Sequence, residues 1–273
     1  MQNKRVIYIL CPGHSGSTLL EYYFSTYPGK IGIGEAYKAV RSFRNEGTVS
    51  LSDYDRETVN KSPFWRHILN TTNTYDSLDE QYAGLYEYIN KAEEFSQYDT
   101  VIDSSKSMAA LRILKKQIGK NISVAVVVKD VRSWIVSQYE NNYRKNRGIP
   151  FAYNFRLIVK WYRTYFQIRK NLNKMNIDYT MVPYDLFCLD RNTIENQLKE
   201  QFSLGGNADF TKTNSMNILG NRMKKEANRE LKISYDYRWL KRSEWNIPWF
   251  FLPPGLKKFN YQYAWNLKRS VKL

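Results

Sequence analysis

Short runs of apolar residues recur along the chain, and each is bounded by polar or glycine-containing segments. The run Ile122–Val128 (ISVAVVV) shows no alternation of apolar and polar positions, which is typical of a central parallel strand covered on both faces. Arg5–Leu10 has the same character, and residues 179–182 predict a further strand. Lys30–Gly34 and residues 100–102 predict two shorter strands. The pattern therefore predicts a set of short strands separated by long intervals.

The intervals between these strands carry apolar residues at helical spacing. In residues 78–95, for example, Tyr82, Leu85 and Ile89 fall on one helical face. Further helices are predicted over residues 17–27, 108–117, 131–143, 154–175 and 192–202, and a helix start at Ser62-Pro63. Strands that alternate with helices indicate an α/β fold in three layers, with a central parallel sheet flanked by helices.

A length of 273 residues suits one α/β domain, and we expect residues 1–273 to form a single domain. Residues 35–73 are mixed in pattern, and residues 210–273 form a basic, aromatic-rich C-terminal segment. The helical spacing of four aromatic residues predicts that their side chains lie in the core rather than in a binding platform: Trp161, Tyr162, Tyr165 and Phe166.

Basic residues outnumber acidic ones, with 42 Lys and Arg against 26 Asp and Glu and a net charge of +16. Such a charge attracts anionic partners, whether nucleotide, acidic glycan or nucleic acid, without choosing among them. The two cysteines, Cys11 and Cys188, cannot build a disulfide framework, and no Cys/His spacing indicates zinc. Because no secretory leader or membrane-length apolar run is apparent, we expect a soluble, cytoplasmic protein, and a lumenal enzyme whose N-terminal anchor was removed stays open as the alternative.

The loop after the first strand has the composition of a phosphate-binding loop. Its sequence is Cys11-Pro12-Gly13-His14-Ser15-Gly16-Ser17-Thr18, and it leads into the predicted helix 17–27. The glycines allow the backbone to bend around an anion, the helix N-terminus offers free N–H groups, and three hydroxyls add donors. A Walker loop requires glycine and lysine where this chain has Cys11 and Ser17, which argues against an ordinary ATP- or GTP-hydrolysing loop.

The ends of the other predicted strands are polar as well. The second strand is followed by Gly34-Glu35, the third by Asp103-Ser104-Ser105-Lys106, and the long apolar strand by Lys129-Asp130-Val131-Arg132, with Ser137 in the next helix. The carboxyl ends of parallel strands lie at the edge of a sheet where ligands of open α/β sheets bind. This convergence predicts one anion-binding active site.

Together these segments resemble the sulfotransferases that use 3′-phosphoadenosine 5′-phosphosulfate (PAPS). The resemblance lies in CPGHSGSTLL, the Gly-Glu pair, VIDSSK and VVKDVRSWIVS, and it covers residues 5–222. It implies a P-loop-like fold and a single sulfotransferase domain over residues 1–273, in which residues 210–273 cover the nucleotide. It also implies that PAPS is the donor and that no metal is required.

The resemblance assigns nucleotide-binding residues. It implies that the 5′-phosphosulfate binds the loop residues Pro12, Gly13, His14, Ser15, Gly16, Ser17 and Thr18. Lys129 and Ser137, eight positions apart, correspond to the two ligands of the 3′-phosphate, and Arg132 lies in the same motif. Asn221 and Arg222 resemble a segment that closes over the nucleotide. Lys129 stands where the family usually has arginine, which keeps the charge and loses the bidentate geometry.

The resemblance also implies catalytic roles. Glu35 follows the second strand, where several related enzymes place a glutamate that accepts the acceptor's proton. His14 stands where the family usually has Lys or Arg beside the bridging oxygen, and Lys106 is a second candidate for the cation that stabilises the leaving group. The implied reaction moves a sulfuryl group from PAPS to a hydroxyl-bearing acceptor, with a carbohydrate among the candidates. No nucleic-acid partner is expected.

Two other functions stay open at this point. A nucleotide or small-molecule kinase with a degenerate loop predicts dependence on magnesium, whereas sulfuryl transfer predicts none. A non-catalytic binder of acidic glycan or nucleic acid predicts steep salt dependence and no preference for the phosphoadenosine. The acceptor stays open among sugars, lipid-linked glycans, tyrosine and small alcohols, and the sequence carries no signal for the oligomeric state.

Overall fold

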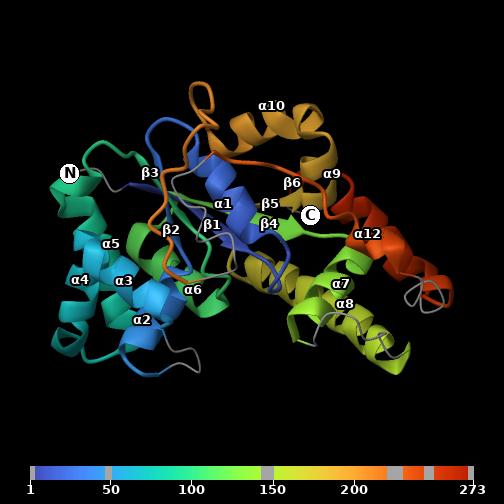
Figure 1. Cartoon of the computed structure of the whole chain (residues 1–273), viewed down its shortest axis with the longest axis horizontal. Helices are drawn as coiled ribbons and strands as arrows, with labels where there is room; N and C mark the ends of the chain where they lie inside the picture. The colour runs from blue at the N-terminus through green and yellow to red at the C-terminus, as the bar shows by residue number, and fades with distance from the viewer. Residues whose placement is uncertain (1–3, 47–50, 143–150, 220–229, 243–248, 270–273) are drawn as a thin grey trace. The chain divides into compact units, whose positions relative to one another are not determined.

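The computed structural model describes residues 4–46, 51–142, 151–219, 230–242 and 249–269 (Figure 1). The fold is α/β, with a central sheet flanked by helices. The strands are hydrogen-bonded in the order β2-β3-β1-β4-β5-β6, with β1 to β5 parallel and β6 antiparallel to β5. The predicted fold class is confirmed, and the antiparallel edge strand is an addition to it.

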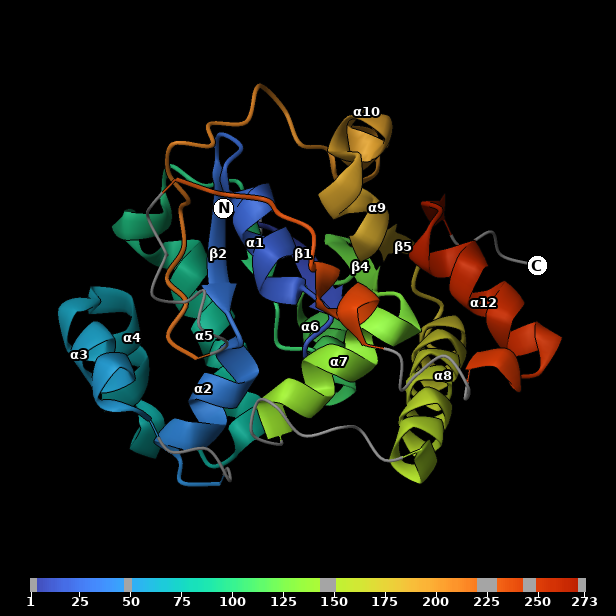
Figure 2. The ribbon, with the colours of Figure 1, turned by 45° about the vertical axis from the view of Figure 1, so that its right-hand side comes forward.

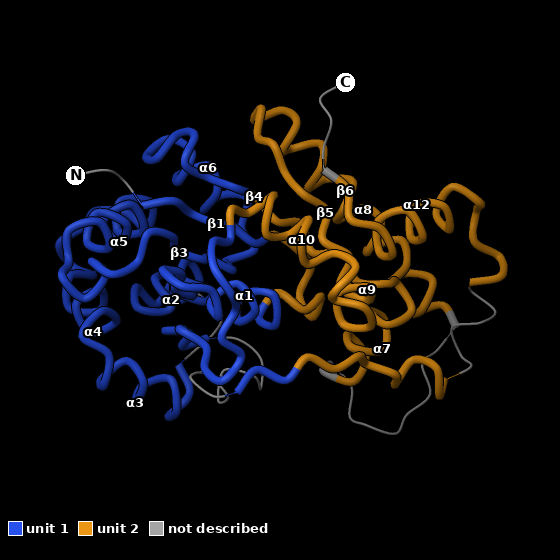
Figure 3. Tube along the Cα trace, turned by 90° about the horizontal axis from the view of Figure 1, so that it is seen from above, with its two compact units in different colours: residues 1–9, 18–123, 204–232 blue, residues 10–17, 124–203, 233–273 orange. Residues whose placement is uncertain are grey.

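The chain forms two compact units, which Figure 3 colours separately. Unit 1 comprises residues 1–9, 18–123 and 204–232, and unit 2 comprises residues 10–17, 124–203 and 233–273. The single domain expected over residues 1–273 stays a prediction.

Unit 1 is built on three strands, β1 (Arg5–Leu10), β2 (Lys30–Gly34) and β3 (Thr100–Asp103). β3 pairs in parallel with both of the others, so that Thr100 lies opposite Arg5 on one side and Lys30 on the other. α2 packs against α4 and α5, and α5 packs against α6, as Figure 2 shows. The helical elements of this unit are α1 (Ser17–Ser25), α2 (Ala36–Phe43), α3 (Asp53–Lys61), α4 (Pro63–Asn70), η1 (Thr72–Thr74), α5 (Leu78–Lys91), η2 (Glu93–Phe95) and α6 (Met108–Ile118).

The region of mixed pattern, residues 35–73, contains helices that local capping explains. Ser52 and Asp55 form a reciprocal capping box at the start of α3. Ser62 caps α4, whose first residue is Pro63, so the predicted helix start is confirmed. The helix predicted over residues 78–95 ends at Lys91, because the extended Ala92 interrupts it before the 3₁₀ turn η2.

A C-terminal segment of unit 1 runs beside β2. The Gly32 N–H donates to the Asn214 carbonyl at 2.9 Å, and the Met216 N–H donates to the Gly32 carbonyl at 2.8 Å. A Cβ at position 32 would lie 2.6 Å from Oε1 of Glu21, so a larger residue there would displace the Glu21 side chain. This approach brings residues 214–217 to the end of β2, directly before Glu35.

Unit 2 is built on β4 (Ile122–Val128), β5 (Tyr179–Pro183) and the edge strand β6 (Lys268–Arg269). The predicted bounds of β4 match the structure, and its residues from Val124 onward are fully buried, as a strand covered on both faces should be. Its helical elements are α7 (Val131–Asn142), α8 (Phe151–Lys174), α9 (Tyr184–Leu189), α10 (Arg191–Phe202), η4 (Tyr237–Lys241) and α12 (Pro254–Ala264).

The burial of the aromatic side chains of α8 in unit 2 confirms part of the prediction made from their helical spacing. Trp161 and Tyr165 are buried, and Phe259 of α12 packs on the Trp161 ring with centroids 5.5 Å apart. Phe166 is 54% exposed, so its predicted place in the core is wrong. It follows Tyr165 directly, and one residue along a helix turns the side chain by about 100°, away from the buried face.

Candidate active site

The predicted phosphate loop lies in unit 2 and has the backbone of a tight turn. His14 and Gly16 have positive φ values, 67° and 94°. A Cβ at Gly16 would overlap the ring of Tyr184, so only glycine fits there. Ser15 and Ser17 are buried, and His14 is half-buried. The loop therefore has a fixed, left-handed conformation before α1 begins at Ser17.

Contacts with α7 and α8 hold this loop. The carbonyl of Gly13 accepts hydrogen bonds from Nε1 of Trp134 at 2.8 Å and from Nε2 of Gln138 at 2.7 Å. The hydroxyl of Tyr165 lies 3.4 Å from Oγ of Ser15 and donates to the Val127 carbonyl at 2.7 Å. These hydrogen bonds hold the Gly13 carbonyl toward α7, so the loop keeps this conformation without a bound anion.

The predicted ligands of the 3′-phosphate lie together in unit 2. Nζ of Lys129 donates to Oγ of Ser137 at 2.8 Å, and both residues are almost fully buried. The helical geometry of α7 places Ser137 one turn after Ser133, whose carbonyl accepts from the Ser137 hydroxyl at 3.0 Å. Nζ of Lys129 also lies 3.3 Å from Oδ2 of Asp236. A buried cation and a hydroxyl thus share one small polar site at the end of β4.

Arg132 is placed differently from the other predicted nucleotide ligands. Its guanidinium makes a bidentate pair with Asp130, with distances of 2.8 Å to Oδ1 and 2.7 Å to Oδ2. Its Cζ also lies over the rings of Trp239 and Trp249, 4.4 and 4.9 Å from their centroids. Burial would raise the pKa of Asp130, but Arg132 and the donor group of Asn260 outweigh it and lower the pKa. The guanidinium therefore joins β4 to the C-terminal segment.

The predicted base lies in unit 1, paired with the predicted cation. Oε1 of Glu35 accepts from Nζ of Lys106 at 2.8 Å, and Oε2 lies 3.2 Å from Nζ of Lys38. Burial would raise the pKa of Glu35, but the charges and hydrogen bonds of Lys106 and Lys38 outweigh it and hold the pKa below its ordinary value. Glu35 is therefore ionised near neutral pH and can accept a proton.

The backbone around Lys106 is anchored by the residues before it. Asp103 is fully buried and accepts from the Tyr82 and Tyr86 hydroxyls at 2.5 and 2.7 Å. Its other oxygen accepts from the Ser105 N–H at 2.7 Å. Lys106 itself has a positive φ of 59°, which is unusual for a residue with a side chain.

Glu21 is a buried carboxylate that the sequence analysis did not single out. It accepts from the Gly34 N–H at 2.9 Å and from the hydroxyls of Ser104 and Ser215 at 2.5 and 3.4 Å. Burial raises its pKa to about 7, against the opposing effect of the hydrogen bonds from Ser104 and Gly34. It thereby joins the segments that carry Glu35 and Lys106. A charged residue inside the apolar run LLEYYF was the available sequence signal.

Asn217 is a second polar side chain buried near Glu35. It is 3% exposed, and neither its amide nitrogen nor its oxygen has a hydrogen-bond partner among the described residues. A Cβ at Gly34 would overlap this amide. An unpartnered buried amide is rare in folded proteins. The predicted residues Asn221 and Arg222 lie outside the described residues.

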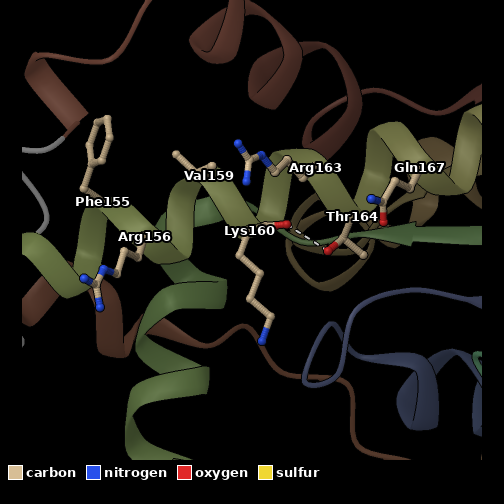
Figure 4. A pocket seen from close by; sticks show the side chains of 7 residues that line it. All are labelled: Phe155, Arg156, Val159, Lys160, Arg163, Thr164 and Gln167. Carbon is tan, nitrogen blue, oxygen red and sulfur yellow. Dashed lines mark hydrogen bonds between the residues drawn. The ribbon is translucent and has the colours of Figure 1, made fainter.

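A hollow of about 500 Å³ lies along α8 of unit 2 (Figure 4). Arg156, Lys160 and Arg163 give it a positive charge, and Phe155 lies at one end. None of the predicted site residues lines it. The hollow is therefore separate from the polar cluster of Lys129 and Ser137.

Within the described part of the chain, no three or more His, Cys, Asp or Glu side chains are grouped so that they could hold a metal ion. That metal is not required stays a prediction. None of the described helices is both long and apolar enough to span a membrane.

The fold has a solved counterpart. A sulfotransferase domain from the olefin synthase of Synechococcus PCC 7002 is similar to this chain, with a TM-score of 0.59 and 14% sequence identity. The similarity covers 97% of this chain and 94% of the other. The fold is that of a sulfotransferase domain. No family model and no curated protein sequence matches the chain.

Proposed function

We propose that this protein transfers a sulfuryl group from PAPS to a hydroxyl-bearing acceptor. The observation that carries the proposal is the buried pair of Lys129 and Ser137 in unit 2, which offers a cation and a hydroxyl to one phosphate. The same unit contains the glycine loop, whose conformation is preset by the bonds from α7 to Gly13. A nucleotide phosphorylated at both its 3′ and 5′ positions matches these two anion sites.

PAPS supplies an activated sulfuryl group whose leaving phosphate is already part of the nucleotide. In the proposed reaction the acceptor oxygen forms a bond to sulfur while the bond from sulfur to the bridging phosphate oxygen breaks. The electron pair of that bond stays on the phosphate, and the acceptor's proton goes to Glu35. Lys106 and His14 stabilise the charge that develops on the leaving oxygen.

The donor set of the chain fits the nucleotide. Loop residues 12–18 provide backbone N–H groups and hydroxyls for the 5′ end, and Lys129 with Ser137 provides donors for the 3′-phosphate. Arg132 contributes through Asp130 and the tryptophan rings, by holding the segment after β4 in place. Asn221 and Arg222 are proposed to cover the bound nucleotide.

The deciding experiment is a calorimetric titration of the full chain with adenosine 3′,5′-bisphosphate, ADP and ATP. We expect the bisphosphate to bind most tightly. Lys129→Ala should weaken its binding by about 10- to 100-fold, the range for a charge-assisted hydrogen bond, and leave ADP binding nearly unchanged. Lys160→Ala, which removes an exposed lysine of α8, is the matched control. Equal binding of all three nucleotides, or tighter ATP binding, would refute the proposal.

Activity is tested separately with PAPS and a panel of sugars, tyrosine peptides and small alcohols. Transfer should persist in the presence of a chelator and should fall sharply in Glu35→Gln. A requirement for magnesium together with phosphate transfer from ATP would support the kinase instead. Strong, salt-sensitive binding of polyanions without any transfer would support the non-catalytic binder.

A further inference from the structure

The proposed 3′-phosphate site already holds an anion that belongs to the protein. Oδ2 of Asp236 lies 3.3 Å from Nζ of Lys129 and 3.5 Å from Oγ of Ser137. A single carboxylate oxygen thus contacts both proposed phosphate ligands. Carboxylate and phosphate oxygens are acceptors of the same kind, so both compete for the same donors.

Asp236 is a permanent anion at this position. Burial would raise its pKa, but the hydrogen bonds and charge of Arg238, together with Lys129, lower it to about 2. Arg238 donates from Nε to Oδ1 and from Nη2 to Oδ2, both at 2.7 Å. The carboxylate is therefore charged throughout the physiological pH range. If it loses its contacts with Lys129 and Ser137, it still accepts hydrogen bonds from Arg238.

The segment around Asp236 is attached to α7 by contacts that do not involve Lys129. The buried side chains of Tyr235 and Trp239 pack with Val136 of α7. Arg238 also pairs with Glu140 of α7. Asp236 can therefore give up its contact with Lys129 and keep its bonds to Arg238, while the backbone on either side of it stays anchored.

We infer that Asp236 is an internal competitor of the nucleotide, whose carboxylate occupies the 3′-phosphate site until a 3′-phosphorylated nucleotide displaces it. The inference rests on the proposed function. Two anions cannot share Lys129 at these distances without strong repulsion, because like charges that are brought together in a partly buried site repel each other with little screening by water. A 3′-phosphate must therefore displace Oδ2 of Asp236, whereas a nucleotide without this phosphate leaves the pair of Asp236 and Lys129 intact.

Displacing Asp236 from Lys129 therefore costs free energy, and only the binding of 3′-phosphorylated ligands requires this displacement. That cost lowers the affinity for both donor and desulfonated product, and it favours product release. Replacing the carboxylate with a neutral amide of the same shape should remove the competition and preserve the packing. Asp236→Asn should bind adenosine 3′,5′-bisphosphate roughly tenfold more tightly than the wild type, with the affinity for ADP unchanged.

The test is a titration of the full chain with both nucleotides at fixed salt, in the wild type, Asp236→Asn and Asp236→Ala. Glu140→Gln is the control, because it removes the other partner of Arg238 and leaves Lys129 untouched. Tighter binding of the bisphosphate in both Asp236 variants, absent in the control, supports the inference. Thermal unfolding of each variant confirms that it is folded.

Two results would overturn the inference alone. Weaker binding of the bisphosphate in Asp236→Asn would show that Asp236 orients Lys129 for the ligand, and unchanged binding would show that it does not compete. Either result overturns the inference alone if the wild type binds the bisphosphate more tightly than ADP. A wild type that binds the two nucleotides equally overturns the proposed function, and the inference with it.

Discussion

Replacing Glu21 with glutamine should make the stability of the protein less dependent on pH. Glu21 lies on α1 with no exposed surface and accepts hydrogen bonds from Gly34, Ser104 and Ser215. Burial disfavours its charged form and raises its pKa to about 7, because the hydrogen bonds from Ser104 and Gly34 and the charge of Lys106 offset only part of the lost hydration. Its ordinary pKa is 4.5.

The sign and size of the effect follow from these two pKa values. Between about pH 4.5 and 7 the folded protein keeps a proton on Glu21 that the unfolded chain has lost. Stability therefore falls as pH rises through this window and levels off above it. One pKa unit corresponds to about 1.4 kcal/mol, so the loss is about 3 kcal/mol. A glutamine carries no titrating proton and should show no such loss.

The assay is thermal unfolding of the wild type, Glu21→Gln and the control Glu87→Gln at several pH values from 4.5 to 8. Glu87 is exposed on α5, so its replacement removes no buried carboxylate. We expect the melting temperature of Glu21→Gln to rise relative to that of the wild type by about 6 °C across the window. A difference that stays constant with pH would refute the argument, because it would mean that Glu21 does not change its protonation state on folding.

Three further substitutions test the site. Gly16→Ala should destabilise the protein by more than about 1 kcal/mol in thermal unfolding, because the φ of Gly16 is positive and Tyr184 of α9 leaves no room for a Cβ. Gly205→Ala is the control, because a Cβ at Gly205 would lie in open space. Asn217→Leu should raise stability by about 1 kcal/mol, because it removes an amide left unpartnered by the described residues; a lower melting temperature would contradict this. Arg132→Met should cost about 3 kcal/mol in denaturant unfolding by leaving the buried Asp130 unpaired, and an unchanged midpoint would contradict that pairing.

The parts of the fold that local sequence determines were predictable. β4 is a continuous apolar run, and only a strand buried on both faces tolerates one, so its bounds match those predicted. The juxtaposition of Lys129 and Ser137 follows from their positions at the end of β4 and two turns into α7, which local geometry fixes. α2 and α3 were less predictable, because α2 is short and α3 is largely polar.

The partners of the site residues could not be predicted, because they come from distant segments. Asp236 lies 107 positions from Lys129 in the sequence. Its surroundings, basic and aromatic without helical or strand periodicity, do not indicate which residue it meets. The same is true of Arg132, whose stacking on Trp239 depends on tertiary packing. The spacing of a motif predicts which side chains of one helix or strand lie together. Ion pairs between different elements depend on the whole fold and cannot be predicted in this way.

Lys106 and Lys129, the two lysines of the proposed reaction, are each paired with a carboxylate. The pairing of Lys106 with Glu35 links stabilisation of the leaving group to removal of the acceptor's proton. While Lys106 contacts Glu35, it holds the pKa of that carboxylate down, so Glu35 is ionised but weakly basic. In the proposed reaction, negative charge grows on the leaving phosphate and attracts Lys106. Any weakening of its bond to Glu35 raises the pKa of the carboxylate, which makes Glu35 a stronger base as the acceptor's proton becomes more acidic. Stabilisation of the leaving group and removal of the proton are thus coupled through one ion pair.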